Sequence, residues 1–65
     1  MTLGMNIKIA RITKGIPQGE LAEKAGISQN TLCQIEGDNQ SPVYGTIEKI
    51  AQALKMTVSE LTKTG

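Results

Sequence analysis

Residues 18–37, which read QGELAEKAGISQNTLCQIEG, predict two short helices joined by a tight turn. Apolar side chains recur at a helical spacing over residues 18–25, and Gly26 ends this first helix because glycine adopts the positive φ that such a turn requires. A second helix over residues 28–36 begins at a serine, which is a favourable N-cap. Gly37 is expected to end the second helix in the left-handed conformation.

Helical periodicity continues on both sides of this stretch. We expect a helix over Leu3–Lys14 before it, and the apolar spacing from Val43 to Leu54 predicts another helix after it. Thr57 and Glu60 have the capping-box spacing that opens a final short helix. No hairpin signal or repeat interrupts the pattern, so we expect an all-α fold: one compact bundle of five short helices over residues 1–65. The core around the turn is expected to contain Leu21, Ala22, Ile27, Leu32 and Ile35.

Composition excludes several classes of chemistry. The chain has 65 residues, seven Lys and Arg against six Asp and Glu, no His, and a single Cys at Cys33. Zinc sites of nitrogen and sulfur ligands and Ser-His or Cys-His nucleophile pairs are therefore excluded. With no paired carboxylates or phosphate loop either, we expect no enzyme and no cofactor. One unpaired thiol favours a reducing cytoplasm, and no apolar run approaches the ~20 residues of a membrane span.

Residue identities at defined spacings extend the pattern over nearly the whole chain. They are Arg11, Gln18-Gly19-Glu20-Leu21-Ala22, Ala25-Gly26-Ile27-Ser28, Leu32, Ile35-Glu36-Gly37, Ser41-Pro42 and Ile50-Ala51-Gln52-Ala53-Leu54. In this order, residues 3–61 resemble the Cro/cI-type (XRE) helix-turn-helix family, to which the lambdoid phage repressors belong. The resemblance implies a lambda-repressor-like fold with its helix-turn-helix unit at about residues 18–36. It also implies a sequence-specific DNA-binding regulator of transcription, a repressor or controller protein, whose helix 28–36 reads the major groove of double-stranded DNA.

The second helix of the unit carries neutral side chains that both donate and accept hydrogen bonds. These are the predicted base-reading residues Gln29, Asn30, Thr31 and Gln34. Amides pair bidentately with adenine, and a threonine methyl can meet the thymine methyl. The alternative interpretation is a solvated helix surface, for which Glu and Lys are the commoner choice. Cys33 is interpreted as a small, outward-facing filler.

Phosphate contacts are expected on both sides of the reading helix. Gln18 stands at a helix N-terminus, where free backbone N–H groups attract an anion. By resemblance it also braces the reading helix, although a plain surface glutamine is the alternative. Asp38 departs from the family pattern because many relatives carry Lys or Arg there. The further predicted phosphate contacts are Ser28, Asn39, Gln40, Ser41, Tyr44 and Thr46.

The resemblance also implies an ion pair and a dimer. Arg11 and Glu36 would form a partly buried structural pair. One module covers only a few base pairs, so a homodimer on palindromic half-sites about 34 Å apart is implied. Its interface is expected on the C-terminal helix, at the surface residues Met56, Val58 and Leu61. A second apolar surface is Met1, Met5, Ile9 and Ile12.

The near-zero net charge of the chain leaves a second function open. Asp38 and a net charge of +1 favour a protein-interaction module on the same scaffold, such as an antitoxin-like or anti-repressor subunit with weak or no DNA binding. For a DNA-binding protein we expect a cytoplasmic location, at the nucleoid.

Overall fold

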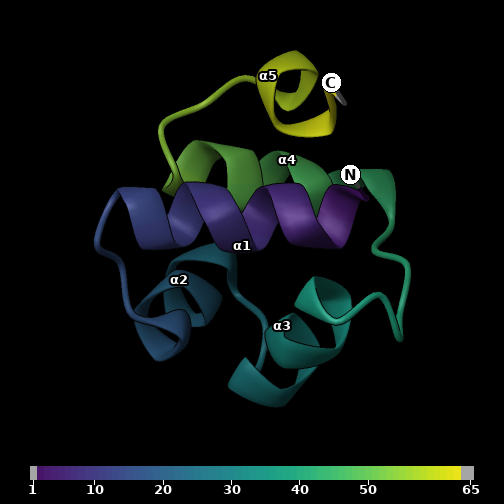
Figure 1. The fold of residues 1–65 in the computed structure, drawn as a ribbon. Coiled ribbons are helices and arrows are strands. Elements are labelled where there is room, and N and C mark those ends of the chain that lie inside the picture. Colours follow the sequence, from purple (N-terminus) through teal and green to yellow (C-terminus); the bar gives the residue numbers. More distant parts are fainter. Residues whose placement is uncertain (1, 64–65) are drawn as a thin grey trace.

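Five α-helices make up the fold in the computed structural model, which describes residues 2–63. Their bounds are α1 Leu3–Thr13, α2 Gln18–Ala25, α3 Gln29–Glu36, α4 Tyr44–Ala53 and α5 Val58–Thr62. Figure 1 shows α2 and α3 on one side of α1 and α5 on the other. Within the described residues the predicted all-α bundle of five short helices is confirmed.

Side-chain caps open three of these helices. The hydroxyls of Thr2, Ser28 and Thr57 each accept a hydrogen bond from a backbone N–H of the first turn that follows. At α5 the predicted capping box is present, because Glu60 also accepts from the Thr57 backbone N–H at 2.9 Å. Val43 precedes α4 without such a bond, so this first member of the apolar spacing lies outside the helix and is exposed.

Each of α1 to α4 is followed, within two residues of its end, by a residue in the left-handed conformation. Gly15, Gly26 and Lys55 hold this position after α1, α2 and α4, and the prediction for Gly26 is confirmed at φ 71°. The prediction for Gly37 is wrong. Gly37 has φ −87°, and the left-handed residue is Asp38 at φ 62°.

The hydrogen bonds after α3 explain this difference. The Gly37 N–H still donates to the Cys33 carbonyl, which continues the helical pattern for one more residue. Asp38 and Asn39 then donate back to the carbonyls of Ile35 and Gln34, which is the pairing of a Schellman motif. Aspartate tolerates the left-handed conformation better than most residues.

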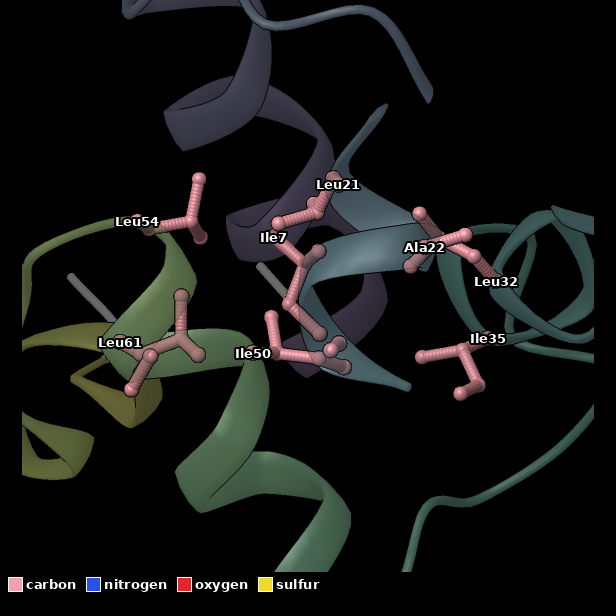
Figure 2. Packing of buried hydrophobic residues seen from close by; sticks show 10 residues of the cluster. Ile7, Leu21, Ala22, Leu32, Ile35, Ile50, Leu54 and Leu61 are labelled. Carbon is pink, nitrogen blue, oxygen red and sulfur yellow. The ribbon is translucent and has the colours of Figure 1, made fainter. Parts of the chain in front are cut away.

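All five helices, together with Leu54 at the end of α4, contribute to one aliphatic core. Figure 2 shows these side chains packed against one another. Burial of each large aliphatic side chain contributes about 1.5–3 kcal/mol. Of the predicted core residues, Ile27 is only partly buried and the other four are buried. The buried apolar residues are Ile7, Leu21, Ala22, Ala25, Leu32, Ile35, Ile50, Ala51, Leu54 and Leu61.

The C-terminal helix is held in the fold by Leu61 and by two hydrogen bonds from α1. Leu61 was expected on the surface, but its side chain is fully buried in the core. Asn6 explains the attachment, because its Nδ2 donates to the carbonyls of Leu61 and Lys63, both at 3.1 Å. Because Asn6 is itself buried, these bonds tie α5 firmly to α1.

The remaining predicted interface residues lie nearer the surface. Met56 and Val58 are half-buried and pack against the core. On the second apolar surface, Met5, Ile9 and Ile12 are exposed, and Met1 lies outside the described residues. None of the helices formed by residues 2–63 has the length and apolar character needed to cross a membrane.

Candidate nucleic-acid interface

The outer face of α3 is an uncharged polar stripe. Its exposed side chains are Gln29, Asn30, Cys33 and Gln34, whose spacing places them on one side of the helix. Leu32 and Ile35 are buried on the opposite side. We call these four exposed residues the α3 face. Three of the four predicted base-reading residues therefore lie together on it.

Thr31 is placed differently from the other predicted base-reading residues. It is half-buried, and its hydroxyl accepts a hydrogen bond from Ser28 Oγ at 2.8 Å. Its backbone N–H donates to the same Ser28 Oγ at 3.1 Å. Thr31 thus lies at the edge of the α3 face, engaged with the N-cap. Cys33, which we interpreted as outward-facing, is exposed and lies on the α3 face four residues after Gln29.

Gln18 of α2 contacts both ends of α3. Its Nε2 donates to Glu36 Oε1 at 3.2 Å, and its Oε1 accepts from Gln29 Nε2 at 3.3 Å. A carboxylate only accepts hydrogen bonds, so the nitrogen of the Gln18 amide must face Glu36 and its oxygen must face Gln29. Gly19 leaves space for this contact, because a Cβ there would come within 3.2 Å of Gln29 Oε1.

An ion pair joins α1 to the end of α3. Arg11 Nε lies 2.8 Å from Glu36 Oε2, and Arg11 Nη2 donates to Glu36 Oε1 at 3.2 Å. The third contact of the guanidinium is the carbonyl of Ile16, at 3.1 Å. The two side chains are 14% and 4% exposed, so the predicted Arg11–Glu36 pair is formed and is largely shielded from water.

Asp38 directs its carboxylate toward α1. Its Oδ2 accepts a hydrogen bond from Thr2 Oγ1 at 2.8 Å, next to the N-terminus of α1, where the helix dipole favours a negative charge. The approach is close, since a Cβ on Gly4 would come within 2.7 Å of Asp38 Oδ1. Asp38 therefore helps to hold α1 against the end of α3.

The predicted phosphate-contacting residues are distributed over three elements. Gln18 begins α2 and is half-buried, and Ser28 is the exposed N-cap of α3. The others follow the end of α3. Asn39, Gln40 and Ser41 are exposed in the loop, Tyr44 is exposed at the start of α4, and Thr46 is half-buried.

A hollow of about 340 Å³ opens between α1, α2 and α3. The ion pair and one residue of the α3 face, Cys33, are part of its lining. The lining residues are Lys8, Arg11, Gln18, Cys33, Glu36 and Gly37. Within residues 2–63 no group of three or more His, Cys, Asp or Glu side chains is placed to hold a metal ion.

Comparison with known proteins finds a phage repressor and a transcriptional regulator among the relatives. The chain is 41% identical over 61 residues to the immunity repressor protein of Bacillus phage phi105, covering 94% of the chain and 42% of the relative. It is 38% identical over 60 residues to the transcriptional regulator SinR of Bacillus subtilis strain 168, covering 91% and 54%. The chain therefore spans about half the length of these relatives.

Solved structures share the fold. SinR in complex with DNA superposes with a TM-score of 0.86 at 38% identity, covering 92% of this chain and 97% of that one. The P22 c2 repressor in complex with a synthetic operator superposes with a TM-score of 0.88 at 24% identity, covering 97% and 96%, which supports the lambda-repressor-like fold. Residues 7–61 match the Helix-turn-helix family. The chain belongs to this family, which confirms the resemblance carried by residues 3–61 of its sequence.

Proposed function

We propose that this protein is a sequence-specific DNA-binding regulator of transcription, without enzymatic activity, that acts as a repressor or controller protein. The α3 face is the observation that carries the proposal. Its amides, from Gln29, Asn30 and Gln34, are exposed on one side of a short helix, and the major groove of DNA admits a helix and displays a distinct donor and acceptor pattern for each base pair.

Recognition on this face depends on hydrogen bonds and little on charge. Gln18 holds the Gln29 amide by one of its N–H groups, which leaves the other N–H and the oxygen for a base edge. Asn30 and Gln34 make no side-chain hydrogen bond among the described residues, so both of their amides are available. We infer that Gln18, Ser28 and the loop after α3 position the domain on the phosphate backbone.

We further propose that the protein binds palindromic half-sites as a homodimer. A single domain presents one reading helix, and two copies about one DNA turn apart would double the number of base contacts. Met56 and Val58 remain the proposed interface residues because they are partly accessible. Leu61 is buried in the core, so it would support the proposed interface from below without contacting the partner.

Fluorescence anisotropy with DNA selected from a random pool tests the proposal. The folded protein should bind saturably at low salt, and the selected sites should show two-fold symmetry. Asn30→Ala and Gln34→Ala should each weaken binding, because each removes a pair that discriminates bases by about 1–3 kcal/mol. Gln52→Ala is the matched control, since Gln52 is an exposed amide on α4. A protein that is folded by circular dichroism yet shows no saturable binding would contradict the proposal.

A protein-interaction module is the second candidate function. Met5, Ile9 and Ile12 form an exposed apolar stripe on α1, where a solvated helix normally carries polar residues. This candidate predicts that Asn30→Ala changes nothing measurable, since the α3 face would then have no ligand.

A further inference from the structure

The helical register of α1 places Lys8 beside the C-terminal end of α3. Gly4, Lys8 and Arg11 lie four and three residues apart, so they share one side of α1. Both neighbours of Lys8 on this side contact the end of α3. Gly4 packs closely against the carbonyls of Ile35 and Glu36, and Arg11 binds the Glu36 carboxylate. Lys8 therefore lies over the same end of α3.

The hollow between α1, α2 and α3 connects Lys8 to the proposed DNA-binding surface. Lys8 lines it together with Gln18, a predicted phosphate contact, and Cys33, a member of the α3 face. The α3 face itself carries no charge. A cation at its edge would be next to the phosphate backbone when the face enters the major groove.

Lys8 is also free to bind an anion. Residues 2–63 form two ion pairs, Arg11 with Glu36 and Lys24 with Glu20, and neither involves Lys8. The Lys8 side chain is exposed. Arg11, the other cation of the hollow, is largely buried and is already engaged by Glu36.

We propose that Lys8 is a DNA-phosphate contact at the edge of the α3 face. The inference rests on the proposed function and extends it to a residue of α1, outside the helix-turn-helix unit. In this chain Asp38 turns away toward α1 and the loop after it is neutral through Gln40, so Lys8 supplies a positive charge on the side of α3 where the loop supplies none.

A purely structural role for Lys8 has a different signature. Its ammonium could offset the partial negative charge at the C-terminal end of α3, which would change thermal stability. Such a role does not change how DNA affinity depends on salt. Each phosphate contact, in contrast, contributes about 0.9 to the slope of log K against log salt concentration, because a counterion is released.

The test compares Lys8→Gln with Lys63→Gln, which removes the same charge on the far side of α1, near α5. DNA affinity is measured by anisotropy over a range of salt concentrations, and melting temperature is measured in parallel. Lys8→Gln should reduce the slope by about 0.9 and weaken binding at low salt, and Lys63→Gln should leave the slope unchanged. Lys8→Arg should retain the slope of the unmodified protein.

The outcomes separate the inference from the proposed function. An unchanged slope for Lys8→Gln, or the same loss for Lys63→Gln, overturns the assignment of Lys8 while DNA binding stands. If the unmodified, folded protein shows no saturable and salt-dependent binding, the proposed function and the role of Lys8 both fail.

Discussion

The side-chain amide of Gln18 donates to the buried carboxylate of Glu36 at 3.2 Å, and this single bond determines which way the amide points. Its oxygen is thereby directed to Gln29, which must offer an N–H in return. Arg11 donates to both oxygens of the same carboxylate. A buried ion pair and one residue of the α3 face thus belong to one hydrogen-bonded chain.

Replacing Gln18 with Ala should weaken DNA discrimination and lower stability modestly. Glu36 loses one hydrogen bond and Gln29 loses its support, so we expect a loss of about 1 kcal/mol in the free energy of unfolding. The adenine preference proposed for Gln29 should relax as well. Urea unfolding and anisotropy with single-base variants of the selected site measure the two effects. Equal discrimination by Gln18→Ala and the control Gln52→Ala would contradict the supporting role.

Arg11→Met should destabilise the protein severely. It leaves the carboxylate of Glu36 buried without its cation, at a cost of about 3–5 kcal/mol. A domain of this length has a total stability of only about 3–10 kcal/mol, so the variant should be partly unfolded at room temperature. The double variant Arg11→Met with Glu36→Leu should recover most of the loss, because it removes both charges. Urea titration followed by circular dichroism measures the free energy of unfolding of the protein and of both variants. A double variant no more stable than Arg11→Met contradicts this account.

Two glycine substitutions should have opposite signs. Gly4→Ala places a Cβ within 2.7 Å of Asp38 Oδ1 and against backbone carbonyls, so α1 must shift, and we expect a loss of about 1–3 kcal/mol. Gly45→Ala in the first turn of α4 meets nothing within 4 Å and should stabilise the protein by up to about 1 kcal/mol. Melting temperatures of the two variants are the measurement, and stabilisation by Gly4→Ala would refute the close approach.

The capping box of α5 should make stability depend on pH. The backbone N–H and then the hydroxyl of Thr57 hold the pKa of Glu60 below its ordinary value of 4.5. Because the folded-state pKa is the lower one, this contribution to stability is fully present above the ordinary pKa. It is lost as pH falls through the folded-state pKa. NMR titration of the Glu60 carboxyl group measures the shift. Glu60→Gln keeps an acceptor but does not titrate, so its stability should vary less over the same acidic range.

The dimer interface is tested by two substitutions that each replace a β-branched apolar residue with threonine. Val58→Thr should raise the concentration at which dimers form, because it adds a hydroxyl at the proposed interface. Ile12→Thr, on the exposed stripe of α1, should leave that concentration unchanged. Sedimentation velocity over a concentration series gives the comparison, with melting temperature as a check on folding. A larger effect of Ile12→Thr would move the interface to α1.

Local signals in the sequence predicted the helices because their physical causes are local. Ser28 and Thr57 cap the turns that follow them directly, and Gly26 adopts its left-handed conformation within the same short turn. The α3 face was likewise predictable, since a helix with Leu32 and Ile35 buried must expose its amides on the other side. Residue spacing therefore predicted the helical order and the outward placement of all four residues on this face.

Contacts between residues far apart in the sequence decided where the turn after α3 lies and how deeply α5 is buried. The left-handed turn lies at Asp38, whose carboxylate also accepts a hydrogen bond from Thr2, at the other end of the sequence. Leu61 is buried because α5 packs against α1. There the Asn6 side chain of α1 donates hydrogen bonds to the carbonyls of Leu61 and Lys63.

The sequence by itself determined an all-α chain with five helices, a turn at Gly26 and an uncharged α3 face, because periodicity and capping act within a few residues. Only the tertiary structure decided that Gln18 joins Glu36 to Gln29 and that Lys8 lies beside the end of α3. Those relationships depend on how α1, α2 and α3 pack, and side-chain spacing along one helix carries no information about the register of its neighbours.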